Sequence, residues 1–160
     1  DLDEDEESDF SVRSTKAALG ILTSITDVLK YFLIAIASIS LLVGGIGIMN
    51  SMLIAVNARV REIGLRKAVG ARPGEIMFQF LIESVIVTLL GGLIGIAIGV
   101  GFAFIASLII PSLGYDWEFL VPLSSIGISF GVCFVIGMIF GLYPAWKASK
   151  VSPMEALRYE

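Results

Sequence analysis

Three long apolar segments, almost without charge, constrain this chain more than any other feature. The first, Tyr31–Val56, has no charged residue in 26 positions. The second, Ile76–Ile110, contains only Glu83, and the third, Leu123–Lys147, is uncharged as far as Trp146. About 20 apolar residues are enough for a helix to cross a hydrocarbon core of about 30 Å. We therefore predict an all-α integral membrane protein with three transmembrane helices and the lipid bilayer as its solvent.

The distribution of charge excludes some partners and predicts an orientation. Only 16% of the residues are charged, against about 25% in ordinary soluble domains. The main basic cluster lies between two apolar segments rather than on a soluble face, so we expect no nucleic-acid partner. Eight of the eleven basic residues fall in two segments: Arg59, Arg61, Arg66, Lys67 and Arg72, then Lys147, Lys150 and Arg158.

The positive-inside bias places those two segments, residues 57–75 and the tail 148–160, in the cytoplasm. The loop 111–122 has acidic Asp116 and Glu118 and no basic residue, so it is expected outside with the N-terminus. This is the topology of a multi-pass protein of the plasma membrane.

The residues before the first span carry weaker signals. Residues 1–14 form an acidic tail, in which the alternation of Phe10–Arg13 suits a short strand. Residues 15–30 have apolar positions at helical spacing and should continue unbroken into the first span. That helix could lie on a surface or rise from the membrane as a stalk. Because the chain begins with Asp, we expect it to be part of something longer.

Catalytic machinery is missing from the sequence. There is no His, no Asp in any span and no G-x-x-x-x-G-K-[ST] loop, so we expect no catalytic residue, metal or cofactor. Gly45-Ile46-Gly47 begins a dinucleotide pattern, but Asn50 stands where its third glycine should be. Cys133 is interpreted as a small apolar residue of a helix.

Glycines are the positive signal inside the spans, because small residues let helix backbones approach closely. The candidates for packing within the chain or between two copies are Gly44, Gly45, Gly47, Gly91, Gly95, Gly99, Gly137 and Gly141. Ordinary glycine abundance in membrane helices is the alternative. Glu83, the one ionisable group well inside a span, could be functional or could simply reach interfacial water.

The segment 57–75 is the most specific. Glu62 and Arg66 have the spacing and order of a stabilising helical pair. Gly70 suits a helix end, and Pro73 with Glu75 suits the next helix start. These signals predict a short basic helix across the inner surface, either a rigid handle or a topology signal in contact with head groups. In the tail, the capping-box pattern of residues 152–155 predicts another short helix.

Several motifs resemble the MacB/FtsX-like ABC transporter permease family, and its MacB branch most closely. They are Ile39–Asn50 (ISLLVGGIGIMN), Arg61–Ala71 (REIGLRKAVGA), Phe80–Ser84 (FLIES) leading into Gly91-Gly92, Tyr143–Lys150 (YPAWKASK) and Pro153–Arg158 (PMEALR). The resemblance covers roughly residues 10–160. It implies the C-terminal part of a four-span permease, with residues 1–14 a remnant of an outer domain and 15–30 the stalk.

The resemblance also implies a homodimer that binds two copies of an ABC-type ATPase, separate or fused, and is not itself an enzyme. The residues of the implied coupling helix are Arg59, Arg61, Glu62, Ile63, Gly64, Arg66, Lys67 and Gly70. Such a permease would couple ATP hydrolysis to export of a peptide, lipoprotein or amphipathic cargo. An FtsX-like signalling subunit that activates an external hydrolase, and a scaffold without an ATPase, are the alternatives.

Overall fold

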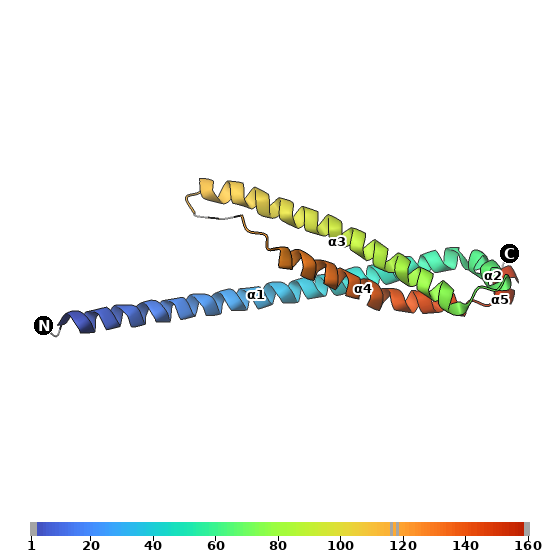
Figure 1. Ribbon diagram of the computed structural model, residues 1–160, viewed down its shortest axis with the longest axis horizontal. Helices are drawn as coiled ribbons and strands as arrows, with labels where there is room; N and C mark the ends of the chain where they lie inside the picture. Colours follow the sequence, from blue (N-terminus) through green and yellow to red (C-terminus); the bar gives the residue numbers. More distant parts are fainter. Residues whose placement is uncertain (1–2, 116, 118, 159–160) are drawn as a thin grey trace. The chain divides into compact units, whose positions relative to one another are not determined.

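Most of the residues that can be described are helical. The computed structural model describes residues 3–115, 117 and 119–158, with side chains described at 16–154 and 156 within those ranges. Its helices are α1 (Asp3–Ala58), α2 (Val60–Ala68), α3 (Pro73–Ser112), α4 (Leu123–Lys150) and α5 (Pro153–Arg158) (Figure 1). The all-α prediction is confirmed.

One local prediction is wrong. Residues Phe10–Arg13, predicted as a short strand, belong to α1. A strand needs a neighbour to satisfy its backbone hydrogen bonds, and the described part of the chain contains no strand. The side chains of the acidic tail at positions 1–9, and the acidic residues Asp116 and Glu118 of the loop 111–122, lie outside the described residues.

Three helices among the described residues are long and apolar enough to cross a membrane: Lys16–Ala58 within α1, then α3 and α4. They contain the three predicted spans. The predicted helix at 15–30 does run into the first span without a break. Helix α4 continues to Lys150, three residues past its predicted end, because polar residues can extend a helix beyond the apolar segment.

The chain divides into two compact units, residues 1–42 and 43–160. The first is the N-terminal portion of α1. The second contains the end of α1 and helices α2 to α5, and it holds the buried core. This core consists of Met52, Val56, Ile63, Ile76, Phe80, Ala145 and Ala148. It therefore joins the end of α1, the start of α3 and the end of α4 around α2.

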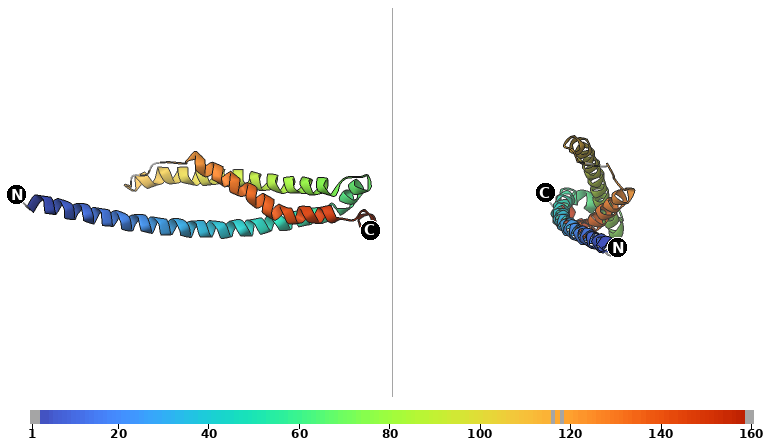
Figure 2. Two further views of the ribbon diagram at one scale, coloured as in Figure 1. Left: turned by 60° about the horizontal axis from the view of Figure 1, so that its bottom comes forward. Right: turned by 90° about the vertical axis from the view of Figure 1, so that its left-hand side faces the viewer.

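Helices α3 and α4 pack against each other (Figure 2), and small residues make the close contacts. A Cβ on Gly141 would lie 2.6 Å from Ser84 Cβ, and one on Gly137 would lie 3.0 Å from Val85 Cα. Ser84 Oγ donates to the carbonyls of Leu81 (2.7 Å) and Gly137 (3.1 Å). Gly137 and Gly141 are therefore positions where α4 lies in close contact with α3.

The other predicted glycines fall into two groups, with and without a close neighbour at the Cβ position. Gly45 lies against the ring of Phe140, where a Cβ would come within 2.9 Å of the ring Cγ. Gly92, which the spacing argument passed over, meets Cys133 Sγ at 2.6 Å from its ideal Cβ position. The remaining members have open space at the Cβ position, namely Gly44, Gly47, Gly91, Gly95 and Gly99. Among the described residues, no neighbouring helix comes within 4 Å of the Cβ position at these five glycines.

Candidate functional site

Helix α2 is bounded by local signals that the sequence carries. Arg59 separates α1 from α2. After the last helical residue, Ala68, the chain turns at Gly70, whose φ of 106° is in the region that only glycine adopts readily. The Gly70 amide donates to the Lys67 carbonyl and the Ala71 amide to the Arg66 carbonyl, both at 3.0 Å. These two bonds form a Schellman motif, which satisfies the last carbonyls of the helix.

The start of α3 follows at once. The Glu75 carboxylate accepts a hydrogen bond from the Arg72 amide at 3.1 Å, and Pro73 occupies the first turn. Glu75 satisfies an amide that has no partner within the helix, and Pro73 needs no partner for its nitrogen. The link between α2 and α3 is therefore short, and its helix boundaries are those that the sequence predicts.

One face of α2 is fixed against the protein. The Ile63 side chain is only 3% exposed and belongs to the core. A Cβ on Gly64 would overlap the Cβ of Ala156, so α2 and α5 are in close contact there. Lys67 Nζ donates to the carbonyls of Ser149 (2.5 Å) and Val151 (2.8 Å), at the end of α4. A cation at the C-terminus of a helix is favourable, because the last carbonyls there carry partial negative charge.

The opposite face of α2 is exposed and chemically mixed. It consists of Arg61, Glu62, Leu65 and Arg66 of α2, with Val69 directly after the helix, and is here called the outer face. Leu65 is 56% exposed and Val69 84%. Arg66 donates to Glu62 (2.5 Å), the predicted pair, and to Gln79 of α3 (2.7 Å).

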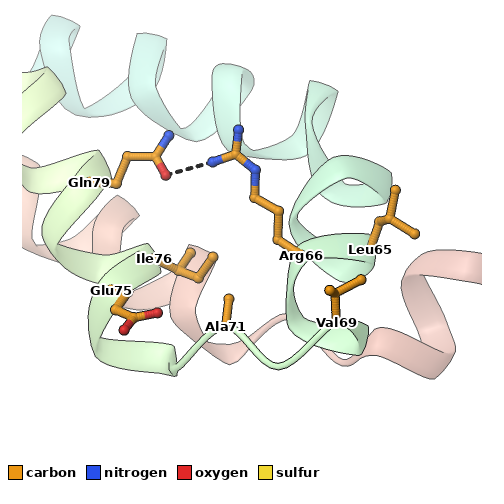
Figure 3. A pocket seen from close by; sticks show the side chains of 7 residues that line it. All are labelled: Leu65, Arg66, Val69, Ala71, Glu75, Ile76 and Gln79. Atoms are coloured by element: carbon orange, nitrogen blue, oxygen red, sulfur yellow. Dashed lines mark hydrogen bonds between the residues drawn. The ribbon is translucent and has the colours of Figure 1, made fainter.

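Two hollows flank this outer face and meet at Leu65. One, of about 500 Å³, is lined by Leu65, Arg66, Val69, Ala71, Glu75, Ile76 and Gln79 (Figure 3). The other, of about 460 Å³, is lined by Ala58, Arg59, Arg61, Glu62 and Leu65. Exposed apolar side chains beside fixed charges, with hollows on either side, are features of a protein-binding surface.

Glu83 forms an ion pair with Arg59. Its carboxylate lies 3.4 Å from Arg59 Nη1, with the two side chains 33% and 47% exposed, respectively. The pair ties the junction of α1 and α2 to α3. Partly exposed pairs of this kind contribute little stability, and both roles that the sequence leaves open for Glu83 stay predictions.

The structure therefore divides the predicted coupling residues. Arg61, Glu62 and Arg66 lie on the outer face, whereas Ile63, Gly64 and Lys67 face the protein, and Arg59 and Gly70 mark the ends of the helix. A direct docking contact of Ile63 does not fit its burial. Sequence reasoning missed Leu65, Val69 and Gln79. The only available signal for Leu65 was its place beside Arg61 on one helical face, four positions away.

Comparison with known proteins identifies the class of this chain. The family model described as the FtsX-like permease C-terminal region matches residues 34–153. The chain belongs to the FtsX-like permease family. Within it, the MacB-like resemblance is confirmed by a macrolide export ATP-binding/permease protein MacB of Bdellovibrio bacteriovorus, 52% identical over 87% of this chain.

Two further relatives have a similar level of identity. The MacB protein of Syntrophobacter fumaroxidans is 44% identical over 97% of the chain. An uncharacterized ABC transporter permease of Bacillus subtilis, YknZ, is 47% identical over 96% of it. The chain spans only 21% of the two MacB proteins and 38% of YknZ. What it shares with them is the C-terminal membrane part of an FtsX-like permease.

Proposed function

We propose that this chain is the membrane part of a MacB-like ATP-driven exporter, and that α2 is the helix through which a partner ATPase acts on it. The proposal is supported by one observation above all. Helix α2 has one face fixed in the protein by Ile63, Gly64 and Lys67, and a free outer face flanked by hollows. A helix held in this way can transmit a push from a bound partner instead of yielding to it.

The relatives support the choice of partner and direction. Two of them are named as export proteins with an ATP-binding part, and the third as an ABC transporter permease. These names favour export over the signalling alternative. The same end of the second unit holds α2 and α5, which are in contact. This agrees with the predicted placement of both basic segments in the cytoplasm, where ATP is available.

We further propose two copies of the permease and two of the ATPase in the assembly. The glycines with open space on α1 and α3, Gly44, Gly47, Gly91, Gly95 and Gly99, offer surfaces where the helices of a second copy or of another span can approach. Binding drives a conformational change only if the ATPase has different affinities for two permease states. The energy of ATP would thereby reach the outer side through α1, with the cargo class left as peptide, lipoprotein or amphipathic molecule.

Charge reversal on the outer face tests the proposal. With the full-length permease and its ATPase supplied as a separate chain with ATP, Arg61→Glu with Arg66→Glu should weaken ATPase binding roughly tenfold or more, because like charges placed opposite each other at an interface cost several kcal/mol. Lys147→Glu with Lys150→Glu is the matched control, since it makes the same change in net charge on exposed residues of α4. Equal losses in both variants would mean that the outer face is not the docking surface.

A second measurement separates transport from signalling. If the protein is an exporter, its ATP hydrolysis should rise when an amphipathic cargo is added to the transporter in lipid nanodiscs. If hydrolysis instead rises only with a soluble cell-wall or peptide hydrolase, the signalling function is correct and export is refuted.

A further inference from the structure

The short C-terminal helix α5 and the Lys67 ammonium hold α2 on the side opposite to the outer face. Ala156 of α5 is 1% exposed and lies against Gly64. From the ideal Cβ position of Gly64, Ala156 Cα lies at 3.6 Å and Pro153 Cα at 3.8 Å. Only a glycine at position 64 lets the two helices approach this closely while residue 156 keeps its methyl group.

The second contact is polar and independent of the first. Lys67 Nζ reaches two carbonyls, of Ser149 in the last turn of α4 and of Val151 immediately after it. Val151 and Ser152 alone separate α4 from α5. Two contacts therefore connect α2 to a segment more than 80 residues away in sequence: the Lys67 contact reaches the C-terminal end of α4, and the Gly64 contact reaches α5.

The covalent link of α2 runs elsewhere, to α1 and α3. Without the rear contacts, a force on the outer face would reach α4 through the apolar core around Ile63 or indirectly through α3, which packs against α4. Figure 1 shows α2 and α5 next to each other at the end where α3 begins and α4 ends.

We infer that residues 151–158, together with Lys67, form a brace that makes α2 and α4 move as one body. In this arrangement Gly64, Lys67 and Ala156 are positioning residues for the outer face and do not themselves contact the ATPase. The inference rests on the proposed function, because the brace matters only if a partner loads α2. It assigns to the C-terminal tail the task of passing that load to the last membrane helix.

An exchange of one methyl group tests the brace. Gly64→Ala places a Cβ on that of Ala156 and should separate α2 from α5. Gly64→Ala combined with Ala156→Gly should restore the fit, because the new Cβ then meets Ala156 Cα and Pro153 Cα at ordinary contact distances. Lys67→Met removes the polar contact while keeping an unbranched chain, and Lys147→Met, on exposed α4, is its control.

The experiment uses the full-length transporter in nanodiscs, with spin labels at Ala68→Cys, exposed on α2 but not part of the outer face, and at Lys147→Cys on α4, and all other cysteines replaced. The unsubstituted pair should give one narrow distance that ATP and the ATPase leave unchanged. Gly64→Ala should broaden the distribution of this distance. Lys67→Met should broaden it as well; for this variant and its control Lys147→Met the α4 label is moved to Leu142→Cys, because position 147 is substituted in the control. Permease-dependent ATP turnover should fall roughly fivefold or more in these variants, while the Kd for the ATPase stays within about twofold.

The outcomes separate the two proposals. A narrow distance in Gly64→Ala, or broadening that Ala156→Gly does not reverse, would overturn the brace. A distance in the parent protein that shifts on ATP binding would overturn it too, since α2 and α4 would then move apart. Failure of the parent protein to bind its ATPase would refute the proposed function alone, because the label distances measured without ATPase still decide whether the tail holds α2 to α4.

Discussion

Adding a methyl group at Gly141 should destabilise the packing of α3 against α4. The Cβ of Gly141→Ala would lie 2.6 Å from Ser84 Cβ. Rotation about χ1 cannot remove this overlap, because Cβ is fixed by the backbone. The two helices must therefore move apart by roughly 1 Å to reach an ordinary contact, and overpacking of this kind typically costs about 1–3 kcal/mol.

Two smaller effects modify that figure. Separation lengthens the bond from Ser84 Oγ to the Gly137 carbonyl, now 3.1 Å, and such bonds between membrane helices contribute about 0.6 kcal/mol on average. Replacing glycine by alanine within a helix gains up to about 1 kcal/mol in propensity. The two nearly offset, so we expect Gly141→Ala to lower the free energy of unfolding by about 1–3 kcal/mol.

The assay is reversible unfolding of the purified protein in mixed micelles, followed by helical circular dichroism. Gly131→Ala is the matched control, since it lies on the same helix with open space at its Cβ position and keeps the propensity gain. It should be neutral or slightly stabilising. If Gly141→Ala were as stable as Gly131→Ala, the close approach at Ser84 would not be what holds α3 against α4.

Three further predictions concern the α2 region. Gly70→Ala should cost about 1–2 kcal/mol, because φ at Gly70 is 106°; thermal unfolding would show this, and Gly74→Ala, with open space at its Cβ position, should show no loss. A double-mutant cycle of Arg59→Met and Glu83→Gln should give a coupling energy of about 0.2–1 kcal/mol. A value near 3–5 kcal/mol would instead indicate that the pair is desolvated in the membrane. With Cys133→Ser as background, Val69→Cys should react with an impermeant maleimide only from the cytoplasmic side, and Leu120→Cys only from outside; the reverse pattern would refute the assigned orientation.

Local signals in the sequence were sufficient for the helix boundaries around α2. The Glu62–Arg66 pair, the end of α2 at Gly70 and the start of α3 at Pro73 each depend on residues within a few positions of one another. Their geometry follows from the helix repeat and from the conformational range of glycine and proline. The three spans could equally be predicted from the sequence, because length and absence of charge decide whether a helix can cross a bilayer.

Tertiary structure decided which faces are used. In a membrane helix, the side chains that face lipid are as apolar as those that face protein, so the sequence pattern does not distinguish Gly95, with open space, from Gly141, in contact with Ser84. On α2, Ile63 and Leu65 are both aliphatic, and only the packing of the chain makes one buried and the other exposed. In the sequence, Lys67 was one more basic residue of the segment predicted to be cytoplasmic. Its position at the end of α4 depends on a chain fold that joins residues more than 80 positions apart, which no local pattern encodes.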